Sequence, residues 1–229
     1  MTIGLVKDIA RMLDISAVQA DSTESDIRNM AALAKKYDCV ACFAMPAYTR
    51  LLKELLCYAP NVNVGGVIGF PSGANTIESK VQQTHQLLDL GCNELDMVIN
   101  IGRLKSADFA YVFNDVYSVV NVAGNICVKL ILECHYLTND EIKTACELAV
   151  KAGIGFVKTG TGWAPTGATP GNVELMKRCV GERAQVKAAG GVRDLATLLN
   201  LHRLGATRFG VSAKSAKLIL EEMELKANG

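Results

Sequence analysis

The chain has 229 residues and a mass of 24.5 kDa; half of its residues are hydrophobic and 21% are charged. This composition is typical of a globular protein and excludes a largely disordered chain. The 24 basic and 23 acidic side chains leave a net charge of +1, which gives no electrostatic case for a nucleic acid or a membrane surface as partner.

The expected strands are short and alternate with longer helix-type stretches from one end of the chain to the other. In chain order they are Arg11–Ser16, Cys39–Phe43, Asn63–Gly69, Asn93–Ile99, Cys127–Glu133, Gly155–Lys158, Gln185–Ala189 and Thr207–Gly210. Apolar residues at helical spacing predict helices between them, among others over Glu24–Tyr37, Ala74–Leu90 and Thr138–Ala152. Gly91 is expected to end the second of these helices, and Thr138 and Glu141 to form a capping box at the start of the third.

Eight strand–helix units in one chain of this size predict an α/β protein, a single (β/α)8 TIM barrel over residues 1–229. No linker or break in composition divides the chain. Strands with apolar residues on both faces, such as Lys129–Leu132, are typical of a parallel sheet that helices cover. A doubly wound open sheet is the rival architecture, but no Gly-x-Gly-x-x-Gly motif follows the first strand.

Eight scattered cysteines and the first residues of the chain bear on its location. Met1–Asp8 lacks the apolar region of a secretory signal, and the uncharged run Cys39–Ala47 is far shorter than the roughly 18 residues that span a bilayer. We therefore expect a cytoplasmic protein with free, mostly buried thiols.

Ionisable residues stand in several strands that should be apolar. They are Asp14, Asp96, Lys129 with Glu133, Lys158 and Lys187. Burying an unpaired charge costs several kcal/mol, so such residues are paired or functional. The three lysines fall on the fifth, sixth and seventh strands, where neighbours lie ~4.8 Å apart.

Closely spaced buried lysines favour Schiff-base chemistry. Each ammonium disfavours protonation of the next, and desolvation acts in the same direction, so the pKa of one lysine falls towards neutrality. Its neutral amine can attack a carbonyl, and a carboxylate such as Asp96 can shuttle the α-proton, directly or through water. The alternative is structural: the lysines satisfy buried carboxylates, among them Lys129 with Glu133, or extend outward between helices.

Two glycine-containing segments predict an anion site. Lys187–Arg193 and Arg208–Ala213 each lead from one of the last two strands into a helix. In barrels these two loops commonly bind phosphate through backbone N–H groups.

A metal or redox role has little support. Cys39-x-x-Cys42 lacks a second pair at zinc spacing, and His85, His135 and His202 are scattered. We expect neither a metal nor another cofactor.

Five stretches together resemble the deoxyribose-phosphate aldolases of class I, which use a Schiff base and no metal. They cover nearly the whole chain: Val67–Gly73, Asn93–Asn100, Val128–Glu133, Phe156–Gly162 with Gly167–Thr169, and Val186–Arg193.

The resemblance implies a role for individual residues. Lys158 would be the Schiff-base nucleophile, Lys187 the lysine that lowers its pKa, Asp96 the carboxylate of the proton relay and Asp14 a hydrogen-bonding partner in the site. The family's phosphate contacts fall on Thr161, Gly162, Gly190, Gly191, Gly210 and Ser212. The implied reaction is reversible cleavage of 2-deoxy-D-ribose 5-phosphate to glyceraldehyde 3-phosphate and acetaldehyde, in deoxyribose phosphate catabolism.

The chain departs from the family at several positions. Gly160 and Ala213 stand where serine is usual, Trp163 is bulky for a loop beside the substrate, and the stretches around Asp14 and Cys42 differ from the usual pattern. These departures leave open the phosphate affinity and the aldehyde that is accepted. A Schiff-base aldolase with another small substrate and a catalytically silent sugar-phosphate-binding barrel remain alternatives. The oligomeric state is also open, with a homodimer or a homotetramer as candidates.

Overall fold

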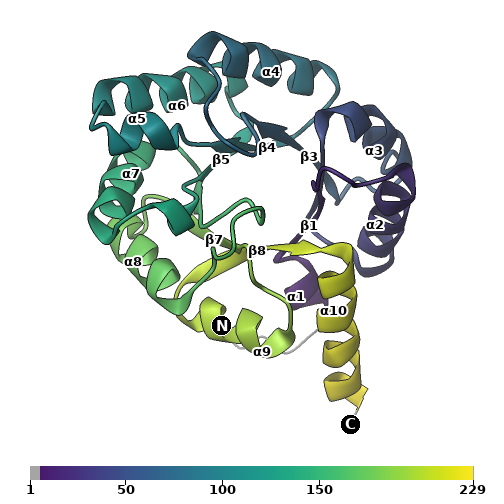
Figure 1. The fold of residues 1–229 in the computed structure, drawn as a ribbon. Helices are drawn as coiled ribbons and strands as arrows, with labels where there is room; N and C mark the ends of the chain where they lie inside the picture. Colours follow the sequence, from purple (N-terminus) through teal and green to yellow (C-terminus); the bar gives the residue numbers. More distant parts are fainter. Residues whose placement is uncertain (1–5, 229) are drawn as a thin grey trace.

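Eight parallel strands form a closed barrel in the computed structural model, which describes residues 6–228 (Figure 1). The strands are β1 (Leu13–Ala17), β2 (Ala41–Ala44), β3 (Asn63–Ile68), β4 (Glu94–Val98), β5 (Cys127–Ile131), β6 (Phe156–Lys158), β7 (Gln185–Ala189) and β8 (Ala206–Ser212). Each strand pairs with the next in sequence, and β8 closes the barrel on β1. The predicted TIM-barrel architecture is therefore confirmed. The domain expected over residues 1–229 reaches into residues 1–5 and 229, which lie outside the described part.

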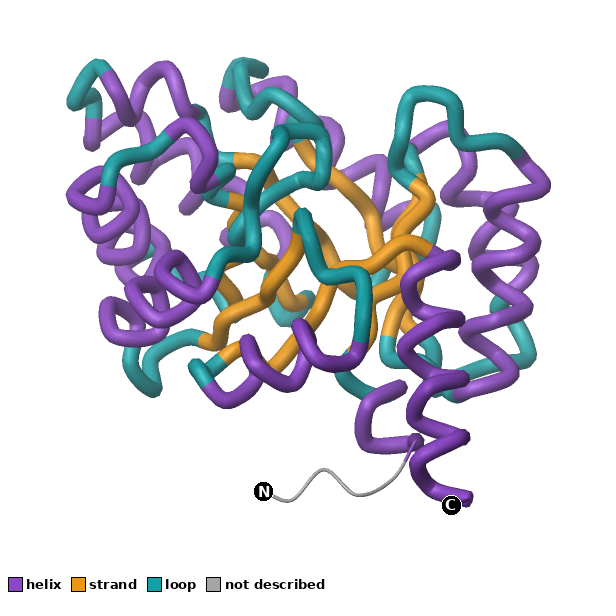
Figure 2. The backbone as a smooth tube through the Cα atoms, turned by 60° about the horizontal axis from the view of Figure 1, so that its bottom comes forward, coloured by secondary structure: helices purple, strands orange, loops and turns teal. Residues whose placement is uncertain are grey.

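Helices surround the barrel (Figure 2). They are α1 (Val6–Ala10), α2 (Glu24–Tyr37), α3 (Thr49–Leu55), α4 (Ile77–Asp89), α5 (Ile101–Lys105), α6 (Phe109–Ala123), α7 (Asn139–Lys151), α8 (Pro170–Val180), α9 (Leu195–Arg203) and α10 (Ala213–Asn228), with short 3-10 turns at Pro46–Tyr48 and Cys134–Tyr136. No helix of residues 6–228 is long and apolar enough to cross a membrane.

Side-chain alternation along the strands separates two interiors. Because successive residues of a strand point to opposite faces, one set faces the helices and the other faces the barrel axis. In β4, Leu95 and Met97 belong to the large apolar core under the helices, whereas Glu94 and Asp96 do not. The same alternation places Lys129 inside and Leu130 outside in β5. The hydrophobic core therefore lies between barrel and helices, which leaves the barrel axis for polar groups.

The helix ends follow the local sequence. Thr138 caps α7 and forms the predicted capping box with Glu141, while Gly91, with φ of +86°, follows the last turn of α4. The helix expected from Ala74 begins three residues later, because Thr76 accepts a hydrogen bond from the N–H of Ser79 and acts as its N-cap.

Among the eight strand predictions, Gln185–Ala189 matches the structure at both ends, and the other seven differ by one or two residues at one end or both. β1 begins at Leu13 rather than Arg11, because α1 precedes it and Arg11 and Met12 close its last turn with backbone hydrogen bonds. β8 extends to Ser212, two residues beyond the predicted end. The extension brings Ser212 alongside Ser16 at the carboxyl end of the barrel, where the loops gather.

Candidate active site

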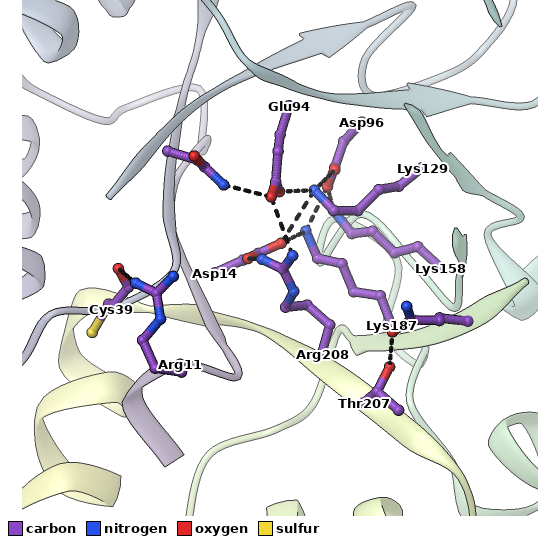
Figure 3. Close-up of polar contacts among 12 residues, drawn as sticks. Arg11, Asp14, Cys39, Glu94, Asp96, Lys129, Lys158, Lys187, Thr207 and Arg208 are labelled. Carbon is purple, nitrogen blue, oxygen red and sulfur yellow. Dashed lines mark hydrogen bonds and ion pairs between the residues drawn. The ribbon is translucent and has the colours of Figure 1, made fainter. Parts of the chain in front are cut away.

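The barrel axis holds a buried network of seven charged side chains, which we call the buried charge cluster (Figure 3). Its members are Asp14, Glu94, Asp96, Lys129, Lys158, Lys187 and Arg208. They come from β1, β4, β5, β6, β7 and β8, so the closure of the barrel brings together residues nearly 200 positions apart. The sequence predicted five of the seven; Glu94 and Arg208 were missed.

Asp96 is the centre of the cluster. Its Oδ2 accepts hydrogen bonds from the Nζ atoms of Lys158 and Lys187, each at 2.7 Å, and its Oδ1 accepts one from Lys129 at 3.1 Å. Burial opposes ionisation of this carboxyl, but the charges of the three lysines outweigh it and hold its pKa well below the ordinary value. Asp96 is therefore a carboxylate, and it holds two lysine amines at the same oxygen.

Lys158 and Lys187 are direct neighbours. Their Cα atoms are register partners between β6 and β7, as expected for lysines on adjacent strands. Burial is the main reason that the pKa of Lys158 falls to about 8; Asp96 opposes this effect and Lys187 adds to it. Close lysines do contribute as the sequence predicted, but desolvation contributes more.

Asp14 lies on the far side of Lys187. Its Oδ2 is 2.5 Å from Lys187 Nζ and 3.5 Å from Lys129 Nζ, and its Oδ1 accepts a hydrogen bond from Arg208 at 2.7 Å. Burial acts against the charged form, but Lys187, Lys129 and Arg208 together lower the pKa of Asp14 to about 2. Asp14 thus keeps the Lys187 side chain oriented beside Lys158.

The predicted pairing of Lys129 with Glu133 is wrong. Lys129 Nζ instead lies 2.5 Å from Glu94 Oε2 and also contacts Asp96 and Asp14, whose charges raise its pKa against the effect of burial. Glu133 stands four residues further along, past the end of β5, and four residues of a strand span about 13 Å. Its carboxylate accepts hydrogen bonds from the N–H and the hydroxyl of Thr161.

Phe43 lies beneath two of the lysines. Its ring centroid is 4.3 Å from Lys187 Nζ and 4.5 Å from Lys129 Nζ, which is cation–π geometry. Gly65 on the adjacent strand makes room for the ring, because a Cβ there would lie 2.3 Å from it. Phe43 therefore supports the two ammonium groups from the apolar side of the barrel.

A cavity of about 240 Å³ opens above Lys158 at the carboxyl end of β6, β7 and β8. All six residues predicted to contact phosphate line it: Thr161, Gly162, Gly190, Gly191, Gly210 and Ser212. Its other polar lining comes from residues that the sequence did not single out for this role: Ser16, Gln19, Arg193 and Ser215. Lys158 and Arg193 line this cavity, whereas no carboxylate does, which favours an anionic occupant.

The departures from the family pattern have structural correlates. A Cβ at Gly160 would lie 2.8 Å from Glu133 Oε1, so the glycine leaves space for this carboxylate. Ala213 starts α10 and carries no hydroxyl, but Ser215 lies within 3.2 Å of the Ser212 hydroxyl and lines the same cavity. Ser215 therefore supplies a second hydroxyl to the cavity beside that of Ser212.

Trp163 lies in the loop after β6, next to Gly162. Its indole N–H donates to the Val18 carbonyl at 2.9 Å, and its ring meets Phe70 edge to face at a centroid distance of 6.1 Å. The side chain therefore ties the loop after β6 to those after β1 and β3. Val18, Gly162 and Ala164 all line the cavity, so Trp163 stands at its edge.

The two missed members of the cluster carried a detectable signal. Glu94 precedes Asp96 by two residues in one strand, and Arg208 precedes Gly210 by two, so each shares the inward face of its strand. Glu94 also accepts a hydrogen bond from Asn63 on β3 at 2.8 Å. Period-two alternation alone was enough to place both side chains inside.

Comparison with known proteins identifies relatives in both sequence and structure. Residues 10–213 match the family model described as DeoC/LacD family aldolase. The chain is 45% identical over 217 residues to the deoxyribose-phosphate aldolase of Klebsiella pneumoniae subsp. pneumoniae, covering 94% of this chain and 87% of the relative. It is 44% identical over 208 residues to that of Halalkalibacterium halodurans, covering 90% and 93%. Among solved structures, the tetrameric deoxyribose phosphate aldolase of Aeropyrum pernix superimposes with a TM-score of 0.88 at 28% identity, covering 97% of this chain and 93% of that one.

Proposed function

This chain belongs to the DeoC/LacD family of aldolases, and we propose that it reversibly cleaves 2-deoxy-D-ribose 5-phosphate through a Schiff base on Lys158. The proposal combines a lysine whose pKa is lowered to about 8 with an adjacent cavity suited to an anion. The products are D-glyceraldehyde 3-phosphate and acetaldehyde. The enzyme is an aldehyde-lyase and needs no cofactor, because the protonated imine itself accepts the electron pair of the broken bond.

The first step forms the imine. The neutral amine of Lys158 attacks C1 of the open-chain sugar, and the resulting carbinolamine loses one water molecule. Lys187 is held between Asp14 and Asp96 and lies beside the developing hydroxide leaving group, to which it can donate a proton. Asp14 orients Lys187, and Lys129 orients Asp96.

The second step breaks the C2–C3 bond. The C3 hydroxyl loses its proton and becomes the aldehyde of glyceraldehyde 3-phosphate, while the bonding electron pair moves to C2 and gives an enamine on Lys158. Asp96 conveys the proton from the C3 hydroxyl to C2, directly or through water, and hydrolysis of the imine then releases acetaldehyde.

The phosphate is bound in the cavity above Lys158. Gly190 and Gly191 have φ values of +82° and +123°, a backbone that lets N–H groups approach an anion closely. Gly162, Gly210, Thr161 and Ser212 complete the set. Thr161 contributes by position, because its hydroxyl donates to Glu133.

The observation that carries the proposal is the sharing of one Asp96 oxygen by Lys158 and Lys187 at the floor of this cavity. The test is cleavage of 2-deoxy-D-ribose 5-phosphate, followed through the release of glyceraldehyde 3-phosphate, beside a panel of unphosphorylated and phosphorylated aldehydes. Cleavage of the phosphorylated sugar supports the assignment. Activity with other aldehydes only would indicate the related Schiff-base aldolase, and absence of any imine would indicate the silent sugar-phosphate-binding barrel.

The surroundings of the enzyme are part of the proposal. We propose a cytoplasmic enzyme of deoxyribose phosphate catabolism with a single domain and small-molecule substrates, and no nucleic acid or membrane partner. A homotetramer is supported by the tetrameric aldolase of Aeropyrum pernix, and a homodimer is the alternative. Light scattering of the purified protein separates the two.

A further inference from the structure

The buried charge cluster contains one more cation than it has carboxylates. Its cations are Lys129, Lys158, Lys187 and Arg208, and its carboxylates are Asp14, Glu94 and Asp96. Charge in a buried site is screened far less than in water, so loss of a single proton that makes the cluster neutral is favoured.

The contacts decide which cation gives up that proton. Lys187 contacts two carboxylates and Arg208 contacts two, while Lys129 contacts three. Lys158 contacts Asp96 alone, and shares that oxygen with Lys187. Lys158 is therefore the cation that the cluster stabilises least.

Glu94 and Arg208 are the two members of the cluster whose contacts reach Lys158 only through other members. Glu94 Oε2 pairs with Lys129 at 2.5 Å and its Oε1 with Arg208 at 3.1 Å, while Arg208 also pairs with Asp14 at 2.7 Å. No contact of either side chain with Lys158 is among the ion pairs of residues 6–228. In Figure 3, Glu94 lies beside Lys129 and Arg208 lies beside Asp14.

We propose that Glu94 and Arg208 are positioning residues that set the protonation state of Lys158 through the charge balance of the cluster. Removing the Glu94 charge leaves the cluster with two excess cations and drives Lys158 further towards the neutral amine. Removing the Arg208 charge leaves equal numbers of cations and carboxylates and favours the protonated, unreactive form. The inference rests on the proposed function in one respect, which is that Lys158 is the nucleophile.

The other groups near Lys158 do not change this sign. Asp96 faces it from β4, Lys129 from β5, Lys187 from β7 and Asp14 from β1, and all four remain in place in the variants below. Glu133, in the loop after β5, is held by Thr161 and is likewise unaltered.

The test measures the pKa of Lys158 itself, in the whole protein and without turnover. Competitive acetylation with trace acetic anhydride at a series of pH values, read by mass spectrometry of the Lys158 peptide, gives the fraction of neutral amine. We expect Glu94→Gln to move the midpoint down and Arg208→Gln to move it up, each by about one pH unit, as expected for a buried charge near a titrating group. The double variant Glu94→Gln/Arg208→Gln restores the balance, and its midpoint should return to that of the unaltered protein.

Controls separate charge balance from damage to the fold. Arg208→Lys keeps the charge and should leave the midpoint in place, and the surface variants Glu174→Gln and Arg178→Gln should not move it. Shifts of the same sign in the two single variants, no shift in either, or a double variant that does not return would overturn the inference. Because acetylation requires no substrate, a protein that shows these shifts but does not cleave deoxyribose 5-phosphate would contradict the proposed function alone.

Discussion

Two groups of buried ionic side chains lie in different parts of this molecule. One is the buried charge cluster on the barrel axis. The other is a pair between helices, in which Lys80 of α4 lies 2.5 Å from Asp115 of α6 and also donates to the Val98 carbonyl at 3.0 Å. Both side chains of the pair are fully buried.

The two groups differ in the ratio of cations to carboxylates and in whether a cavity reaches them. In the Lys80–Asp115 pair one cation meets one carboxylate; burial lowers the pKa of Lys80 and raises that of Asp115, and each partner opposes the shift of the other. In the cluster a surplus cation, Lys158, lies at the floor of an open cavity. A buried lysine is therefore structural where its charge is matched and reactive where it is in excess beside a cavity.

Replacing Lys158, the surplus lysine, should have the largest effect on catalysis. Lys158→Met keeps a side chain of similar length without an amine, and we expect turnover to fall at least about 10³-fold because no imine can form. The measurement is the initial rate of deoxyribose 5-phosphate cleavage. A variant that kept a tenth of the activity would contradict the role of Lys158.

Replacing Lys80, the lysine with a matched charge, should lower the stability of the protein and leave its turnover nearly unchanged. Lys80→Met leaves Asp115 as an unpaired buried carboxylate, and we expect unfolding to become easier by about 3–5 kcal/mol, with turnover of the folded protein within about threefold. Denaturant titration measures the first quantity and steady-state kinetics the second. Lys80→Met/Asp115→Leu is the matched control and should recover much of the lost stability, since it leaves no unpaired charge.

Asp96→Asn separates proton transfer from imine formation within the cluster. The amide cannot convey a proton, so we expect cleavage to slow about 10²-fold or more while imine formation with acetaldehyde persists. Rapid-quench borohydride reduction measures the imine and steady-state kinetics the cleavage. Unchanged cleavage would exclude Asp96 from the proton relay.

The pH dependence tests the surplus charge directly. Because the pKa of Lys158 is lowered to about 8, the neutral amine predominates above that pH and is protonated below it. The rate of imine formation should therefore rise about tenfold per pH unit up to about 8 and level off above it. A rate that kept rising to pH 10 would mean that Lys158 titrates like an exposed lysine.

Sequence reasoning found the barrel and most of the cluster for a physical reason. Lys158, Lys187 and Asp96 are charges in strands that should be apolar, and adjacent parallel strands bring such residues together. The register partnership of Lys158 with Lys187 confirmed that step.

Other parts of the network depend on tertiary geometry. Lys129 was paired with Glu133, which is close in sequence but lies beyond the strand; its actual partner, Glu94, comes from the adjacent strand 35 positions earlier. The contact of Lys80 with Asp115 also spans 35 positions and exists only because α4 packs on α6. The local sequence pattern of neither helix predicts this contact.

Trapping of the imine tests the central claim most directly. The protein is incubated with 2-deoxy-D-ribose 5-phosphate and borohydride, digested, and each lysine peptide is examined by mass spectrometry. A reduced adduct on Lys158 alone, absent from Lys158→Met, is the result we predict. An adduct on Lys129, Lys187 or Lys80, or none on any lysine while the substrate is still cleaved, would contradict it.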